Sequence, residues 1–257
     1  MSNLVQARAM KITLAQLDVT PGDPVGNLSR LAAAHAEAST AGADLVIIPE
    51  MSDTGYDLSL VRGSAGKVRD EVVALSRDGC DLLAGLAEVR GEQVYNTLTY
   101  ASDGEERALY RKRHLIGLYG EPAVITQGTE AVAIKIGGLN WGLMICYDLR
   151  FPEQARDLVL SHGAEVLCYV AAWPVARSDH WTALLRARAI ENQCYAIGVN
   201  RVGTDDGVTF CGRSVVVDPH GEVVAEASGD AEELVSAALD PEEVREVRER
   251  LPFLRDA

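Results

Sequence analysis

Residues 141–153 read Trp-Gly-Leu-Met-Ile-Cys-Tyr-Asp-Leu-Arg-Phe-Pro-Glu, and no other stretch says as much about the architecture. The first five residues form a continuous apolar run, which is typical of a buried strand. The polar residues that follow interrupt the run, and Pro152 favours the first position of a new helix. Cys146 therefore stands at the carboxyl end of a buried strand, where open α/β sheets keep their functional side chains.

The same alternation of strands and helices continues on both sides of this stretch. Apolar or alternating runs predict strands at 10–17, 44–48, 81–86, 94–101, 106–111, 131–136, 141–145, 165–171, 195–199, 213–217, 222–226 and 233–239. Apolar spacing and initiating prolines predict helices at 23–41, 68–77, 152–161, 180–192 and from 241 onward. Helices that give way to hairpins indicate a mixed α/β sheet system. Because no linker-like segment divides the chain, we expect one domain over residues 1–257.

Composition limits the classes of partner. The chain has 257 residues and a formal net charge of −14, from 24 Lys and Arg against 38 Asp and Glu. Such a charge repels nucleic acid and anionic membranes, so we expect no nucleic-acid partner and no membrane partner. It indicates a solvated acidic surface or an adaptation to salt or alkali. No apolar run approaches the ~20 residues that span a bilayer, and the first residues lack a signal-peptide core. We therefore expect a soluble cytoplasmic protein.

The chain has five cysteines, an odd number, and no two of them have CxxC spacing. This pattern argues against a disulfide framework and against a structural zinc site. Four of them lie in or beside apolar runs or in a glycine-rich turn, and are most simply packing residues: Cys80, Cys168, Cys194 and Cys211. Only Cys146 has surroundings that suggest an activated thiol. We expect no metal ion.

Two other charged residues follow apolar runs as Cys146 does. Glu50 follows Leu-Val-Ile-Ile-Pro, and Lys112 follows Ala-Leu-Tyr-Arg. If the three strands are neighbours in a sheet, their ends converge. A thiol attacks a carbonyl carbon as thiolate, so it needs a base such as Glu50. Lys112 can then stabilise the oxyanion, and the Tyr147 backbone N–H offers a second donor.

Each of these residues also has an ordinary structural interpretation. A lone buried cysteine is usually a small packing residue. Glu50 can cap a turn after proline, and Lys112 can belong to a solvated basic patch with its two arginine neighbours. The surrounding motifs decide between the interpretations.

Those motifs resemble the nitrilase superfamily of carbon–nitrogen hydrolases. Residues 44–50 with 54–56 are similar to its glutamate motif, residues 110–115 to its lysine motif, and residues 142–153 to its cysteine motif. The intervals of 62 residues from Glu50 to Lys112 and 34 from Lys112 to Cys146 also suit the family. Downstream, residues 173–174 and 186–193 resemble further family segments, so the similarity covers nearly the whole chain.

The resemblance implies a four-layer αββα sandwich, with two mixed sheets flanked by helices. It also implies a homodimer or higher oligomer, paired across helices that include the one after the nucleophile. Glu50 would be the general base, Lys112 the oxyanion cation and Cys146 the nucleophile, with no cofactor. Glu121, nine residues after Lys112, would be the family's second glutamate and would orient the substrate amide or the water, unless it only caps a loop before proline.

Several neighbouring residues have two possible interpretations or a supporting role. Tyr56 and Trp173 either line the pocket or belong to the core. His114 suggests a Cys–His pair, but the family pattern makes it a structural neighbour of the lysine strand. Arg150 and Glu153 are expected to hold the loop and helix beyond the nucleophile.

The residues after the cysteine favour an amide substrate. The nitrilase branch typically carries Trp-Glu there, whereas this chain carries Tyr147-Asp148-Leu-Arg-Phe-Pro, which resembles amidases, omega-amidases among them. We expect hydrolysis of a small primary carboxamide to the acid and ammonia. Nitrile hydrolysis and N-carbamoyl amine hydrolysis are the alternatives within the superfamily, and a non-catalytic binding protein is the alternative outside it. Arg177 and Arg201 are candidates to bind a substrate carboxylate.

Overall fold

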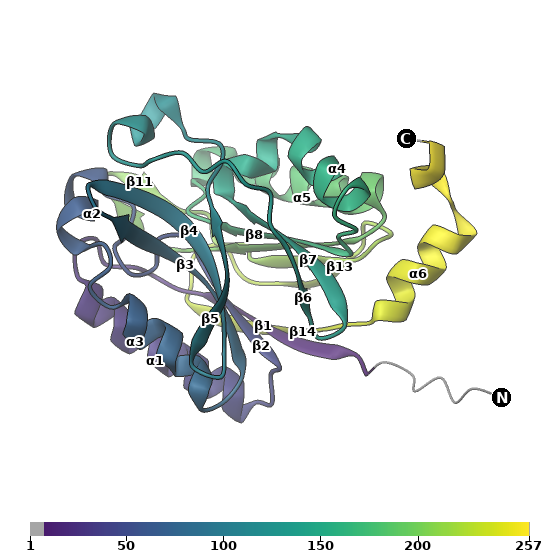
Figure 1. The fold of residues 1–257 in the computed structure, drawn as a ribbon, viewed down its shortest axis with the longest axis horizontal. Coiled ribbons are helices and arrows are strands. Elements are labelled where there is room, and N and C mark those ends of the chain that lie inside the picture. The colour runs from purple at the N-terminus through teal and green to yellow at the C-terminus, as the bar shows by residue number, and fades with distance from the viewer. Residues whose placement is uncertain (1–7, 257) are drawn as a thin grey trace.

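The computed structural model describes residues 8–256. Within that range the strands form two six-stranded sheets and one short two-stranded hairpin. The two sheets lie face to face, and helices cover both outer faces (Figure 1). The α/β class and the four-layer αββα sandwich that we predicted are therefore confirmed.

The first sheet has the order β14–β1–β2–β3–β4–β5. Its strands are β1 (Met10–Gln16), β2 (Leu45–Ile48), β3 (Asp81–Arg90), β4 (Gln93–Ser102), β5 (Glu105–Arg111) and β14 (Glu233–Leu239). β1, β2 and β3 run parallel, while β4 and β5 continue from β3 as antiparallel neighbours. The carboxyl ends of β2 and β5 therefore lie at the same edge of the sheet.

The second sheet repeats this pattern in the order β13–β12–β9–β8–β7–β6. Its strands are β6 (Ala133–Ile136), β7 (Leu139–Ile145), β8 (Val166–Ala171), β9 (Tyr195–Asn200), β12 (Val215–Val217) and β13 (Val223–Glu226). β7, β8 and β9 run parallel at its centre. Such strands are buried on both faces, which explains their nearly continuous apolar sequences.

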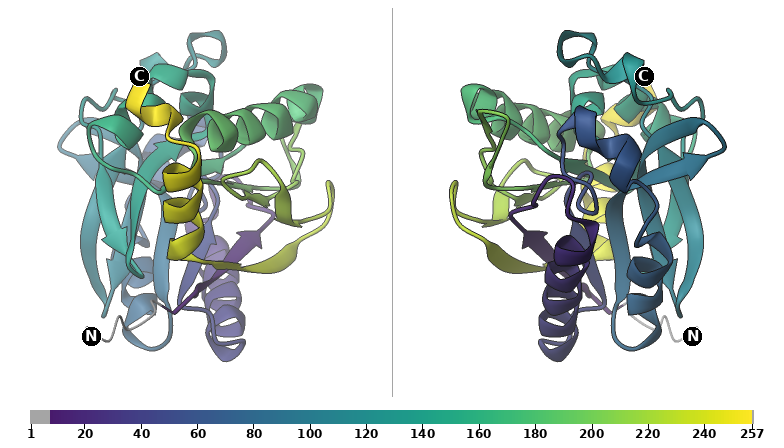
Figure 2. Two further views of the ribbon diagram at one scale, coloured as in Figure 1. Left: turned by 90° about the vertical axis from the view of Figure 1, so that its right-hand side faces the viewer. Right: turned by 90° about the vertical axis from the view of Figure 1, so that its left-hand side faces the viewer.

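The helices divide between the two outer faces. They are α1 (Pro24–Thr40), α2 (Leu58–Ser64), α3 (Arg69–Ala74), α4 (Pro152–Leu160), α5 (Ser178–Asn192) and α6 (Pro241–Arg250). Asp23 caps α1 by accepting a hydrogen bond from the Gly26 N–H at 3.0 Å. Figure 1 shows α1 and α3 beside the first sheet and α4 and α5 beside the second. In the side views, α6 runs along one edge of the sandwich (Figure 2).

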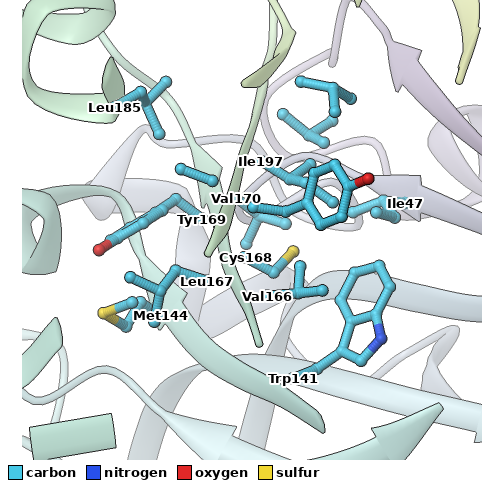
Figure 3. Packing of buried hydrophobic residues seen from close by; sticks show 14 of the residues in the cluster. Ile47, Trp141, Met144, Val166, Leu167, Cys168, Tyr169, Val170, Leu185 and Ile197 are labelled. Atoms are coloured by element: carbon cyan, nitrogen blue, oxygen red, sulfur yellow. The ribbon is translucent and has the colours of Figure 1, made fainter. Parts of the chain in front are cut away.

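The largest core cluster lies between the sheets and under α5. Along β8 the side chains alternate, so that Cys168 and Val170 turn toward Ile47 of the first sheet while Tyr169 turns toward Leu185 of α5 (Figure 3). This period of two is the pleat of the strand. The carboxyl ends of β2 and β8 lie near one another across the interface between the sheets, since the Ala172 N–H after β8 donates to Glu50 Oε2 after β2 at 2.8 Å.

The predicted strands all form, with small differences at their ends, and the Ser102-Asp103-Gly104 region is the turn of the β4–β5 hairpin. The predicted helix at 68–77 is divided into α3 and a short 3₁₀ turn at Leu75–Arg77. α2 and the two-residue strands β10 (Thr204–Asp205) and β11 (Val208–Thr209) were not predicted. None of the helices described over residues 8–256 has the length and apolar character needed to cross a bilayer.

The sequence left open whether the strands before Glu50, Lys112 and Cys146 are neighbours in one sheet. They are not, because β3 and β4 lie between β2 and β5, and β7 belongs to the second sheet. The three strand ends meet across the interface between the sheets, not along one sheet.

Candidate active site

Cys146 stands directly after β7, at the start of a 3₁₀ turn that runs to Arg150. Its φ of +46° lies in the left-handed region, which non-glycine residues rarely adopt. Backbone strain of this kind persists where the surrounding structure fixes it, and it is concentrated at functional sites. Asp148 supplies part of that constraint, since its Oδ2 accepts a hydrogen bond from the Ile145 N–H at 2.9 Å.

Asp148 also joins this turn to the segment that carries Lys112. Its fully buried carboxylate accepts hydrogen bonds from the Tyr110 hydroxyl at 2.6 Å and from the His114 N–H at 3.1 Å. The His114 ring lies 2.7 Å from it through Nδ1 and stacks on Phe151 with ring centroids 3.6 Å apart. His114 is therefore bound within a structural network beside the lysine strand, as the family pattern suggested, and its ring faces Asp148.

Glu50 follows β2 and has three donors around its buried carboxylate. Oε1 accepts from the Lys112 Nζ at 2.9 Å and from the Asn96 Nδ2 at 2.7 Å. Oε2 accepts from the Ala172 N–H at 2.8 Å. Because Ala172 follows β8 of the second sheet, Glu50 is fixed by groups from both sheets. Such a carboxylate has one preferred orientation, which a proton acceptor in a reaction needs.

Lys112 is completely buried between two carboxylates. Its Nζ donates to Glu50 at 2.9 Å and to Glu121 Oε1 at 2.7 Å. Glu121 is held in turn by the Ile116 N–H, which donates to its Oε2 at 2.5 Å. Glu121 also begins a 3₁₀ turn after Gly120, whose φ of +76° is a left-handed conformation that glycine adopts without strain. The structure thus brings Glu121 into the same cluster as Glu50 and Lys112.

The electrostatics of the cluster favour a protonated lysine and a neutral thiol at rest. Burial works to lower the pKa of Lys112, but the nearby negative charges, Glu50 foremost, raise it well above its ordinary value. Burial raises the pKa of the Cys146 thiol well above its ordinary value, and the charge of Glu50 raises it further. A thiol in this state becomes nucleophilic only when a base removes its proton during attack.

A cavity of about 630 Å³ opens above Cys146. The predicted binding residues Tyr56, Tyr147 and Trp173 all line it. The Tyr56 ring lies with its centroid 5.6 Å from the Lys112 Nζ. Glu50, Lys112 and Glu121 are not among the lining residues, so Cys146 is the member of the cluster that meets the cavity directly.

Two guanidinium groups also line the cavity, and one predicted candidate does not. Arg177 lines it and donates to the Tyr119 hydroxyl at 2.8 Å. Arg150 lines it as well and lies 4.6 Å over the Trp173 ring, although we expected Arg150 to act only on the neighbouring loop. The expectation for Arg201 is wrong: it is fully buried and forms ion pairs with Asp205 and Asp18, because it anchors the β10–β11 hairpin.

Sequence reasoning missed Asn96 and the parts played by Asp148 and Arg150. Asn96 had a detectable signal, since it is the polar residue between Val94 and Leu98 on the apolar face of a predicted strand. Asp148 and Arg150 had none beyond their position in the cysteine motif, because their partners come from distant parts of the chain. Among the residues that the structure describes, no group of His, Cys, Asp or Glu is arranged to hold a metal ion.

A two-sheet αββα sandwich with a buried thiol, amine and carboxylates below one cavity is the arrangement of a hydrolase that acts on carbon–nitrogen bonds. The family model for carbon–nitrogen hydrolases matches residues 11–249, and the chain belongs to that family.

Curated relatives agree with this assignment. The chain is 37% identical to a 2-oxoglutaramate amidase of Bacillus subtilis over 253 residues, covering 95% of this chain and 96% of that protein. It is 35% identical to the omega-amidase YafV of Escherichia coli K12 over 254 residues, covering 96% of each. With relatives of these names, the chain is a hydrolase acting on amides.

Solved structures show the same fold. The protein XC1258 of Xanthomonas campestris, a CN-hydrolase superfamily member with an arsenic adduct in its active site, aligns with a TM-score of 0.91 and 29% identity over 97% of both chains. An amidase from Nesterenkonia aligns with a TM-score of 0.86 and 30% identity over 98% of both chains.

Proposed function

We propose that this protein hydrolyses a small primary carboxamide, a short aliphatic amide or an omega-amide, to the carboxylic acid and ammonia through a thioester on Cys146. The observation that carries the proposal is the Glu50–Lys112–Glu121 cluster buried beside Cys146 at a cavity of about 630 Å³. The amidase names of the relatives support the choice of amide over nitrile.

Acylation begins when Glu50 takes the thiol proton and the Cys146 sulfur attacks the amide carbon. Negative charge then develops on the amide oxygen. Lys112, a protonated amine in a dry site, and the Tyr147 backbone N–H stabilise that oxygen. Glu50 gives its proton to the amide nitrogen, the carbon–nitrogen bond breaks, and ammonia leaves a thioester behind.

Deacylation uses the same groups in reverse order. Glu50 takes a proton from water, and the hydroxide attacks the thioester carbon. The carbon–sulfur bond breaks, the thiolate regains the proton from Glu50, and the carboxylic acid is released. Glu121 fixes the Lys112 ammonium throughout, because its Oε1 lies 2.7 Å from Nζ.

The two arginines favour an omega-amide of a dicarboxylic acid within the amide class. Neither Arg150 nor Arg177 is ion-paired with a carboxylate of the described residues, so both can meet a substrate carboxylate. Arginine is suited to this task because its planar donors match a carboxylate in two places. Three aspartates also line the cavity: Asp57 caps α2, Asp205 is paired with Arg201, and Asp206 lies in the turn between β10 and β11.

The proposal is tested by ammonia release from a matched set of compounds: a short aliphatic amide, an omega-amide, a nitrile and an N-carbamoyl amine of equal chain length. We expect the omega-amide to be the best substrate and Cys146→Ala to lose the activity. Cys80→Ala is the control, since Cys80 is buried near α1, away from the cavity. Full ammonia release by Cys146→Ala, or a preference for the nitrile or carbamoyl compound, would overturn the proposal.

A further inference from the structure

Asn96 lies on β4 with its side chain toward the second sheet. It shares this face with Val94 and Leu98, and it is 1% exposed. A polar side chain on an apolar face is normally satisfied by several hydrogen bonds, because an unpaired buried group lowers stability. The partners of Asn96 therefore show what keeps it there.

Those partners are Glu50, the predicted general base, and Lys112, the cation predicted to stabilise the oxyanion. The Asn96 Nδ2 donates to Glu50 Oε1 at 2.7 Å, while its backbone oxygen accepts from the Lys112 N–H at 2.9 Å. Glu50 Oε1 also accepts from the Lys112 Nζ at 2.9 Å. One residue of β4 thus fixes the position of Lys112 just after β5 and the orientation of the Glu50 carboxylate after β2.

The other end of the amide is unsatisfied. Asn96 Oδ1 is buried and has no hydrogen-bond partner in the part of the chain that the structure describes. A side chain retained only for packing or for strand pairing would not keep a buried acceptor unpaired. The amide is instead oriented by its single side-chain hydrogen bond, the one to Glu50.

We propose that Asn96 is a positioning residue for the amide hydrolysis put forward above: its amide holds Glu50 in the orientation in which that carboxylate accepts the Cys146 proton. The inference rests on the proposed function for its activity readout. It adds a group on β4 to a cluster that otherwise draws its side chains from the ends of β2, β5 and β7 and from Glu121.

The first test compares Asn96→Leu with Thr97→Val. Thr97 is the next residue on β4 and is equally buried. Its hydroxyl lies on the opposite face, where it donates to the Leu86 oxygen at 2.8 Å and accepts from the Arg69 Nη1 at 3.3 Å. We expect Asn96→Leu to lower kcat about 10- to 100-fold with KM within about twofold, because the substrate is still bound while Glu50 is no longer held for proton transfer. Thr97→Val should keep kcat within about twofold of the wild type. A wild-type kcat in Asn96→Leu, or the same loss of kcat in Thr97→Val, overturns the proposal.

Asn96→Asp guards against a folding defect in the leucine variant, because it preserves the shape of the side chain. It replaces the amide N–H donor that faces Glu50 Oε1 with a carboxyl oxygen, so the positioning hydrogen bond is lost. We expect a lower kcat with KM within about twofold of the wild type. A wild-type kcat in this variant contradicts the proposal.

Alkylation of Cys146 by iodoacetamide, followed by mass spectrometry, separates this inference from the proposed function. If Asn96 acts through Glu50, alkylation of Glu50→Gln/Asn96→Leu should match that of Glu50→Gln within about twofold, because coupled residues are not additive. The role of Asn96 is overturned if the double variant is alkylated more slowly than Glu50→Gln by the full factor that Asn96→Leu causes on its own. If the wild-type protein releases no ammonia from any amide, the proposed function fails, and the alkylation result still decides the role of Asn96.

Discussion

Asp53 has a fully buried carboxylate in the loop between Glu50 and Tyr56. Both its oxygens face the Ala87 N–H, at 3.0 and 3.2 Å. Burial raises its pKa from 3.8 to about 7, although the Ala87 N–H works in the other direction. A raised pKa in the folded state means a contribution to stability that is complete below pH 3.8 and is lost as the pH rises through about 7.

Asp53→Asn should therefore be stabilising at alkaline pH. The free energy of unfolding of the variant should exceed that of the wild type by an amount that grows by about 2 to 3 kcal/mol between pH 5 and pH 8, at roughly 1.4 kcal/mol for each tenfold change in ionisation. Urea unfolding at the two pH values measures it. A difference that is constant or that shrinks with rising pH would show that the burial of this charge does not govern the effect.

Arg150 provides a prediction on specificity. Arg150→Gln removes a charged donor from the cavity wall, so the KM for an omega-amide should rise about 10- to 100-fold. The KM for a neutral aliphatic amide of the same length should change less than about twofold. Steady-state kinetics on both substrates measures the split, with Arg90→Gln as a control because Arg90 does not line the cavity. An equal rise for both substrates would mean that Arg150 only shapes the cavity.

The close approach of β3 to the end of β2 depends on Gly85. A Cβ atom at this position would lie 2.3 Å from the Pro49 oxygen and 2.6 Å from the Glu50 Cα, so the backbone that carries Glu50 would have to move. We expect Gly85→Ala to lower the free energy of unfolding by about 1–3 kcal/mol. A displacement of this kind should also slow amide hydrolysis at least about 10-fold.

Gly63→Ala is the matched control, since Gly63 lies in α2 with open space where a Cβ would be added. It should leave the amidase rate unchanged and add up to about 1 kcal/mol of stability, because alanine favours helix more than glycine does. Thermal unfolding and ammonia release on both variants measure the contrast. Wild-type kinetics in Gly85→Ala would show that the strand ends tolerate movement without disturbing Glu50.

The long elements were predictable because their apolar periodicity is set by burial alone. Every strand of the two large sheets and the helices from Pro24 and Pro152 follow from that pattern. α2 and the β10–β11 hairpin did not, since they are short and depend on contacts from elsewhere in the chain. One such contact is the Tyr56 N–H, which donates to Asp205 Oδ2 in the hairpin at 3.2 Å. The meeting of Glu50 and Lys112 with Cys146 across two sheets was also hidden, because periodicity does not say which sheet a strand joins.

The outer face of the second sheet bears on assembly. The family resemblance predicts a dimer paired across helices that include α4, and this remains a prediction. α4 and α5 lie together on that face (Figure 1). Leu160 of α4 is 45% exposed and Ile190 of α5 is 53% exposed.

We expect a solution mass of about twice 27.6 kDa by light scattering. Leu160→Glu should shift the protein toward the monomer, because a charge in a closely packed apolar interface is destabilising. Leu118→Glu, which alters an equally apolar residue at the cavity, should not. A wild-type mass of 27.6 kDa at micromolar concentration would contradict the dimer.

The central claim is that Cys146 carries the acyl group during turnover. Acid quenching of the enzyme with an omega-amide, followed by digestion and mass spectrometry, tests it most directly. The account predicts an acyl mass on the peptide that contains Cys146, which appears with the first release of ammonia and is absent from Cys146→Ala. An acyl mass on another residue, or steady ammonia release by Cys146→Ala, would contradict it.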